Sequence, residues 1–187
     1  MIQKVESMRE NKLSNLISSQ TPFGLLTNAY GDKEQHLNSL TLHSSKGVGY
    51  ISKEMITRNV NWIPKYKVLL GKAISGHAGE MDSNGQAKII ATTKVIGKNE
   101  VCTQTYLVVG PYETHQMADN CCSYLKTKFV RFLMFPQMLS ISISKSSFQF
   151  VPLQDFTQEW TDEKLYAKYG LTDEEIAFID SMIRPMN

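Results

Sequence analysis

The sequence predicts an α+β fold, with a central mixed or antiparallel sheet, one long packed helix and two short C-terminal helices. Short apolar runs that alternate with polar residues and are separated by turn residues predict the strands. Apolar residues at three- and four-residue steps over residues 113–135 predict the long helix. Because 187 residues that are 42% hydrophobic suffice for one core, we expect residues 1–187 to form a single domain.

The first half of the chain reads as a helical segment followed by strands. Residues 1–20 form the N-terminal helical segment, with a helix over residues 2–19, in one or two pieces, that ends before Pro22. The expected strands are residues 25–28, 37–43, 48–51 and 66–70, with 37–43 and 48–51 paired as a hairpin or bulged pair. Residues 53–63 are predicted to be helical as far as Pro64.

The second half completes the sheet and adds the helices. A Gly-rich loop is expected at 71–85, strands at 88–96 and 103–109 with a stop at Gly110-Pro111, and a short strand at 148–151. Residues 155–187 form the acidic C-terminal helices. Thr161 is the expected N-cap of the first, and Thr172 with Glu175 forms a capping box at the second.

Composition excludes several classes of protein. No apolar run approaches the roughly 20 residues of a membrane span, and the N-terminus lacks an apolar signal core, so we expect a cytoplasmic protein with no membrane partner. The three cysteines, two of them adjacent, suit neither a disulfide framework nor a Cys-x-x-Cys metal site. We expect reduced thiols, with Cys121 or Cys122 packed in a helix, and no metal site.

The net charge of +2 hides an asymmetry along the chain. Residues 1–154 carry 17 Lys and Arg against 10 Asp and Glu, whereas residues 155–187 carry 3 against 8. Nine of the basic residues lie within residues 44–98, beside three acidic ones. This window can form a patch that faces a polyanion, or it can simply be a solvated surface.

Catalytic motifs of DNA-modifying enzymes are missing from the sequence. It contains no Asn-Pro-Pro-Tyr segment for a flipped base and no Gly-x-Gly turn after a strand for a cofactor, so it lacks a methyltransferase core. Glu80, Asp82 and Lys88 are candidates for metal-dependent cleavage, with two carboxylates for Mg²⁺ and a lysine for the transition state. The alternative is a polar loop tip.

Two further groups could contact phosphates. Serine hydroxyls between residues 140 and 147 lie beside Lys145, and they suit either phosphate contacts or a surface connection. Lys128 and Arg131 are three residues apart on one side of the predicted helix, which suits either a phosphate contact or a solvated helix face.

An ordered set of segments carries a family resemblance. The segments are Phe23-Gly-Leu-Leu-Thr27, Lys46-Gly-Val-Gly-Tyr-Ile51, Val68-Leu-Leu70 with the Gly-rich loop, Cys102-Thr-Gln-Thr-Tyr-Leu107, Tyr124-Leu-Lys-Thr-Lys-Phe129 and Trp160-Thr-Asp-Glu-Lys-Leu-Tyr166. Over about residues 21–187, the chain resembles the C-terminal target-recognition region of bacterial type II restriction–modification enzymes that join an adenine-specific methyltransferase to a restriction endonuclease.

The resemblance implies sequence-specific binding of double-stranded DNA by a chain that is not itself catalytic. It also implies a partner, the methyltransferase and endonuclease region of the parent protein, where S-adenosylmethionine and Mg²⁺ would bind; no cofactor is expected in this chain. Two alternatives remain, an assembly module of the same system that does not contact DNA and a metal-dependent nuclease fragment.

The resemblance supplies no base-contact code, so candidate DNA contacts follow from residue type and loop position. They are Lys46, Lys53, Arg58, Asn59, Lys65, Lys67, Lys72, His77, Asn84, Gln86, Lys128, Arg131 and Lys145.

Overall fold

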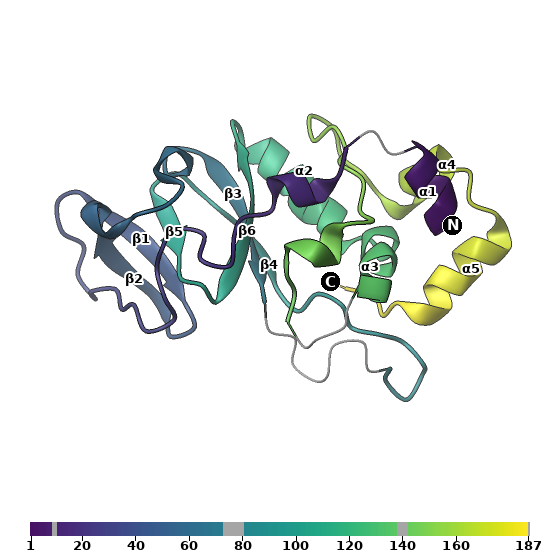
Figure 1. The fold of residues 1–187 in the computed structure, drawn as a ribbon, viewed down its shortest axis with the longest axis horizontal. Helices are drawn as coiled ribbons and strands as arrows, with labels where there is room; N and C mark the ends of the chain where they lie inside the picture. Colours follow the sequence, from purple (N-terminus) through teal and green to yellow (C-terminus); the bar gives the residue numbers. More distant parts are fainter. Residues whose placement is uncertain (9–10, 73–80, 138–141, 187) are drawn as a thin grey trace.

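The computed structural model describes residues 1–8, 11–72, 81–137 and 142–186. It confirms the α+β class, with helices and strands arranged along an elongated molecule (Figure 1). The strands are β1 (Ser39–Ser44), β2 (Gly47–Ser52), β3 (Tyr66–Gly71), β4 (Thr93–Ile96), β5 (Glu100–Cys102) and β6 (Tyr106–Tyr112). The α-helices are α1 (Ile2–Met8), α2 (His115–Lys126), α3 (Lys128–Met134), α4 (Asp162–Lys168) and α5 (Asp173–Met182). The 3₁₀ turns are η1 (Leu13–Leu16), η2 (Lys53–Met55), η3 (Val60–Trp62), η4 (Phe135–Gln137) and η5 (Lys145–Phe148).

The strands form two sheets rather than the single central sheet that the sequence predicts. In the first, which we call the distal sheet, β1 pairs antiparallel with β2 and parallel with β5. In the second, the central sheet, β3 pairs antiparallel with both β4 and β6. The distal sheet is therefore mixed and the central sheet is antiparallel. In Figure 1 the distal sheet lies at the left, and the central sheet separates it from the helices.

The central sheet is buried on both faces, and each face packs into a different core. Val68 and Leu70 of β3 lie in the core shared with the helices, whereas Leu69 between them lies in the core shared with the distal sheet. In β6, Val108 faces the distal sheet and its two neighbours face the helices. Successive side chains of a strand point to opposite faces, so these apolar runs link the two cores.

The predicted long helix over residues 113–135 is two helices, and Thr127 divides them. Thr127 has an extended backbone, and its hydroxyl accepts from the Val130 backbone N–H at 3.2 Å while donating to the Tyr124 carbonyl at 2.8 Å. The Asp162 carboxylate accepts from the backbone N–H groups of Lys128 and Phe129 at 3.0 and 2.8 Å. These contacts satisfy orphan donors at the start of α3 and favour a break over a continuous helix.

Other local predictions divide into confirmed and wrong ones. The β1–β2 hairpin is confirmed, as are the Thr161 cap of α4 and the capping box of Thr172 and Glu175 at α5. The predicted helix over residues 53–63 is wrong, since Asn59 has a left-handed backbone with φ of 49° and only η2 and η3 form around it. No strand forms over residues 25–28, 88–92 or 148–151, and β6 continues through Gly110-Pro111 to Tyr112.

The two ends of the chain belong to the same core. Val5 and Leu13 near the N-terminus and Ile179 and Ile183 near the C-terminus all pack with the helical side of the central sheet. The ion pair between Lys4 Nζ and the Glu175 carboxylate, at 2.7 Å, also joins the two ends. Cys121 lies buried in the same core as a free thiol. None of the helices in the described ranges is long and apolar enough to span a bilayer.

Replacing Thr127 tests the break between α2 and α3. Thr127→Ala removes the hydroxyl that caps α3, while the Tyr124 carbonyl keeps its bond from the backbone N–H of residue 127, so we expect a loss of about 1 kcal/mol in the free energy of unfolding. Urea unfolding followed by circular dichroism measures it. Thr127→Ser keeps the hydroxyl and should lose less than half as much, and an equal loss in both variants would contradict the capping role.

Candidate nucleic-acid interface

Two predicted DNA contacts are buried and internally bonded. Lys67 has no exposed surface, and its ammonium donates to the Trp62 and Ile63 carbonyls at 3.1 and 3.4 Å. The prediction that Lys67 contacts DNA is therefore wrong, because its charge faces the interior between the two sheets. Arg131 is 3% exposed and its Nε donates to the Lys126 and Thr127 carbonyls, so the predicted exposed pair of Lys128 and Arg131 does not form.

Burial changes the chemistry of Lys67. It lowers the pKa of the ammonium from 10.5 to about 8, although Glu100 and Cys102 act in the opposite direction. Glu100 is already engaged, since His43 Nε2 lies 2.5 Å from its carboxylate. A buried ammonium held mainly by two carbonyls is a structural cation, which fixes the end of η3 against β3.

Several other predicted contacts have partners on the protein surface. Lys65 pairs with Glu113, Lys128 Nζ lies 2.6 Å from an Asp180 carboxylate oxygen, and Gln86 Nε2 donates to the Asp180 carbonyl at 2.9 Å. Lys72 Nζ donates to the Gln20 carbonyl, and burial lowers the pKa of this lysine. Exposed ion pairs are worth at most about 1 kcal/mol, so they weaken but do not abolish the ability of Lys65 and Lys128 to bind an anion.

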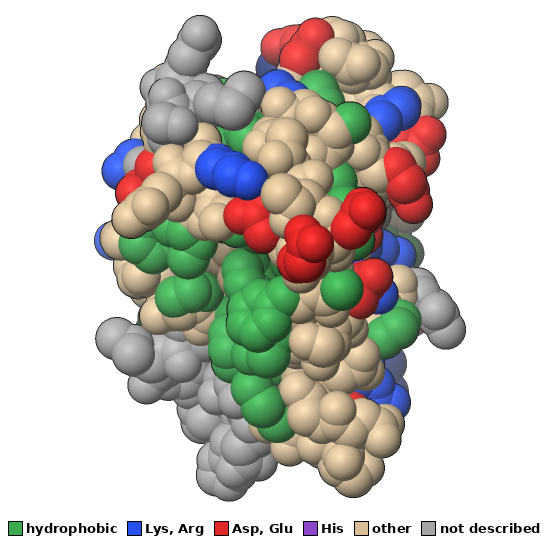
Figure 2. All heavy atoms as spheres, turned by 90° about the vertical axis from the view of Figure 1, so that its right-hand side faces the viewer, with side chains coloured by type: hydrophobic (Ala, Val, Ile, Leu, Met, Phe, Trp, Pro, Cys, Tyr) green, Lys and Arg blue, Asp and Glu red, His purple; other side chains and the backbone are tan. Residues whose placement is uncertain are grey.

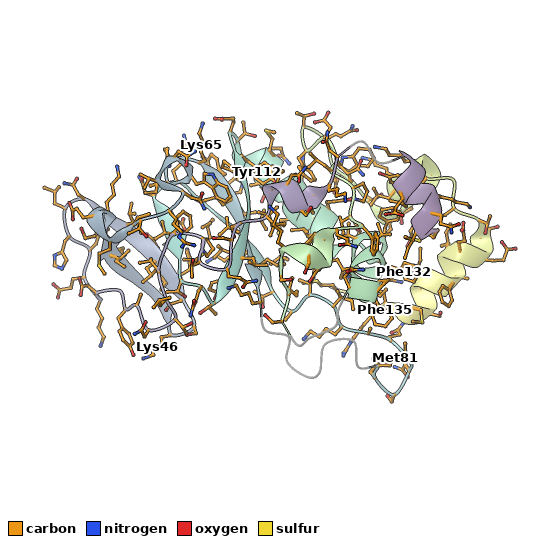
Figure 3. All side chains as sticks on the ribbon, in the orientation of Figure 1. Lys46, Lys65, Met81, Tyr112, Phe132 and Phe135 are labelled. Atoms are coloured by element: carbon orange, nitrogen blue, oxygen red, sulfur yellow. The ribbon has the colours of Figure 1, made fainter. Side chains whose placement is uncertain are left out.

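The predicted contacts do not form one continuous cationic face. Figure 3 shows Lys46 and Lys65 at opposite long edges of the molecule in that view. Asn84 and Lys145 are exposed, and their side chains have no bonded partner among the described residues. His77 lies outside the described residues, as does Ser140 of the Ser-rich run. The basic residues between positions 44 and 98 therefore do not all lie on the same side of the molecule.

The strongest concentration of accessible binding groups surrounds the distal sheet. Of the eight large hydrophobic side chains that are exposed in the described ranges, six fall between residues 26 and 60. They are Leu26, Tyr30, Leu37, Val48, Met55 and Val60. Leu37 is 95% exposed, and the ammonium of Lys46 lies 3.8 Å from the centre of the Tyr30 ring. This concentration of exposed apolar side chains makes the distal end a candidate contact surface.

A polar hollow lies at the start of β1, and Val60 is the one of these six apolar side chains that lines it. Its volume is about 610 Å³, and it is lined by Asn38, Ser39, Leu40, Lys53, Glu54, Ile56, Val60 and Asn99. Asn38 and Asn99 have left-handed backbones with φ of 65° and 60°, which asparagine tolerates better than most residues. Both are exposed, and neither side-chain amide has a hydrogen-bond partner in the part of the chain that the structure describes. We call this hollow, together with the exposed apolar side chains between residues 26 and 60, the distal surface.

The distal surface offers the three kinds of contact that read duplex DNA. Asparagine amides can pair with the adenine edge, a lysine such as Lys53 can bind a phosphate or guanine, and apolar side chains can contact a thymine methyl group. Sequence reasoning included Lys53 but missed Asn38 and Asn99. Asn38 fell inside the predicted strand over residues 37–43, and Asn99 fell in the connection between the strands predicted at 88–96 and 103–109, where asparagine is equally well explained by turn chemistry.

Two neighbours of the distal surface have structural roles. Arg58 Nη1 donates to the Thr21 hydroxyl at 2.7 Å, and Asn59 Nδ2 donates to the Pro22 carbonyl at 2.7 Å. These bonds tie the loop before η3 to the segment after η1. Arg58 remains exposed, whereas Asn59 is committed to holding the loop.

The structure describes two members of the candidate cleavage group, Asp82 and Lys88. Asp82 Oδ1 accepts from the backbone N–H groups of Asn84 and Gln86 at 2.9 and 3.0 Å, which lowers the pKa of Asp82 and stabilises a turn. Glu80 lies outside the described residues. Among those that are described, no three His, Cys, Asp or Glu side chains come together as a metal site.

Comparison with known proteins returns no match to a family model, to a curated protein or to a solved structure.

Lys67 makes stability depend on pH in a defined direction. Its pKa is about 8 in the folded state and 10.5 when exposed, so its burial opposes folding fully below pH 8 and ceases to do so above pH 10.5. Relative to Lys67→Met, the wild type should gain roughly 3 kcal/mol across this window. Urea unfolding of both proteins between pH 7 and 10.5 measures the difference; a constant difference would show that Lys67 keeps an ordinary pKa.

Proposed function

We propose that this chain is a sequence-specific double-stranded DNA recognition domain of a restriction–modification enzyme. It positions a methyltransferase or nuclease that lies elsewhere in the parent protein. The observation that carries the proposal is the distal surface, where the unpaired amides of Asn38 and Asn99 line a hollow with Lys53 and Glu54, and exposed apolar side chains lie elsewhere around the same sheet. The resemblance of the ordered segments supports the same function.

Charge supports the distal end as the one that approaches DNA. The helical end holds the acidic residues 155–187, and Figure 2 shows Asp and Glu side chains gathered on that face. Because duplex DNA carries a dense negative charge, this end repels it, whereas residues 26–60 at the distal end carry Lys33, Lys46, Lys53 and Arg58 against Asp32, Glu34 and Glu54. The domain would therefore lie on DNA with its helices directed away from the duplex.

Selection from a library of random 40-bp duplexes tests the proposal and requires no assumption about the recognised bases. We expect one enriched motif, bound at least 100-fold more tightly than a scrambled duplex, with an affinity that falls steeply as salt rises. Fluorescence anisotropy with both duplexes measures this. Equal weak binding to both, or no binding, would contradict the proposal.

Variants of the hollow should separate base reading from phosphate binding. Asn99→Gly removes the amide, and glycine keeps the left-handed backbone, so we expect roughly 5- to 150-fold weaker binding to the enriched motif with unchanged binding to scrambled DNA. Lys53→Ala should weaken binding to both duplexes about equally. Lys94→Ala, an exposed lysine of β4, is the matched control, and a change as large as that of Lys53→Ala would contradict the assigned surface.

A second candidate function is assembly, and a groove at the helical end favours it. Met1, Ile2, Phe132, Phe178 and Ile179 line an apolar groove of about 500 Å³, with Glu174 and Glu175 at its edge. The apolar strip and neighbouring acidic side chains are visible in Figure 2. Phe178 is 55% exposed and packs edge-on against Phe132. Such a groove suits an apolar segment with basic flanks on the methyltransferase region of the parent protein.

Replacing Phe178 tests the assembly function. Phe178→Ser should weaken capture of the separately expressed methyltransferase region by at least tenfold, because it removes the largest exposed apolar contact. Isothermal titration calorimetry measures the affinity. Leu37→Ser, the matched change at the distal surface, should leave it unchanged, and a similar loss in both variants would speak against this docking site.

A further inference from the structure

A second hollow gathers three cationic side chains on the helical side of the central sheet. Its volume is about 250 Å³, and its lining consists of Lys88, Ile90, Ala91, Arg131, Arg184, Pro185 and Met186. No described acidic side chain lines it. We call it the cationic hollow. Its three charges come from three separate segments of the chain, so the fold and not local sequence brings them together.

Backbone bonds hold these segments in place. The Ala87 N–H donates to the Met182 carbonyl at 2.8 Å, and the Arg184 N–H donates to the Ala87 carbonyl at 3.2 Å. Lys88 follows directly on the bonded residue Ala87. The guanidinium of Arg131 donates through Nη1 to the Arg184 carbonyl, which attaches α3 to the same junction. The cationic groups therefore start from fixed backbone positions.

The charge of Arg131 has no hydrogen-bonded carboxylate. Its Nε and Nη1 donate only to backbone carbonyls, and Nη2 makes no hydrogen bond within the described part of the chain. Burial lowers the pKa of Arg131, and Asp162 opposes this from a distance. A buried charge is costly unless an opposite charge compensates it.

The neighbouring carboxylates are already committed to other donors. Asp162 accepts from two N–H groups at the start of α3, and Asp82, which lies near Arg184, accepts from the backbone of its own turn. Asp180 is bonded to Lys128. None of the three lines the cationic hollow, so its positive charge is left for a ligand.

We propose that the cationic hollow binds a phosphate group. Two guanidinium groups and an ammonium that line one hollow suit the oxygen atoms of phosphate, and the apolar Ile90 and Met186 in the same lining lower the local polarity and so strengthen these charge interactions. The phosphate belongs either to the DNA backbone or to a small phosphate-bearing molecule. The site does not depend on the distal surface contacting DNA.

Arginine side-chain NMR provides a direct test with full-length protein. The chain has four arginines, so substituting Arg9, Arg58 and Arg184 in turn assigns their Nε–H signals and leaves the fourth signal to Arg131. Titration with sodium pyrophosphate at constant ionic strength should move both signals saturably and leave Arg58 unmoved. The double variant Lys88→Ala with Arg184→Ala should bind pyrophosphate at least tenfold more weakly, while Lys94→Ala should change the affinity less than twofold.

The variants avoid the buried guanidinium so that folding is preserved. Arg184 bonds to Ala87 through its backbone, which alanine retains, and Arg184→Gln repeats the test with a longer neutral side chain. Thermal unfolding checks that each variant is folded. If pyrophosphate moves neither signal saturably in the wild type, or if Lys94→Ala weakens binding as much as the double variant, the cationic hollow is not a phosphate site.

A second titration with the enriched duplex identifies the source of the phosphate. If the duplex moves the Arg131 and Arg184 signals, the DNA backbone occupies the hollow; if only pyrophosphate does so, the ligand is a small phosphate-bearing molecule. Both outcomes support the site. Asn99→Gly should lose base discrimination while its Arg131 signal still responds to pyrophosphate, so failure of the distal surface and failure of the cationic hollow can be distinguished.

Discussion

The burial of the central sheet on both faces is the constraint on which the rest of the structure depends. Val68, Leu69 and Leu70 of β3 contribute alternately to two cores, so neither the distal sheet nor the helices can pack without this strand. A shift of the register by one residue would exchange the two faces and disturb both cores together. The distal surface and the cationic hollow are therefore held on opposite sides of one shared scaffold.

Burial, more than the number of basic residues, decides which cations can meet a ligand. The basic window of residues 44–98 contains Lys67, which is buried, Lys65 and Lys72, which have partners, and Lys53, which is free in the described part of the chain. A count of charges treats all four alike. Only the packing of β3 between two cores separates a structural ammonium from one that solvent or DNA can reach.

The sequence predicted features that depend on local chemistry and missed those that depend on distant contacts. The hairpin of β1 and β2 and the cap at Thr172 follow from turn and capping residues. The break at Thr127 depends on Asp162, which lies far along the chain. The division into two sheets depends on which strands have both faces buried in a core. The continuous apolar runs of β3 and β6 are typical of strands buried on both faces, but periodicity does not show which element covers each face.

The same reasoning explains why the candidate sites were only partly predictable. Lys53 could be chosen as a basic residue in a loop, but Asn38 and Asn99 share a hollow only because β1 and β5 pair in parallel and bring their preceding turns together. Lys88, Arg131 and Arg184 likewise meet because Ala87 bonds to the chain after α5. In both places the ligand-facing groups come from separate segments, and the backbone that joins them is paired within the protein. Rigid positioning of this kind is what selective recognition of a base edge or a phosphate requires.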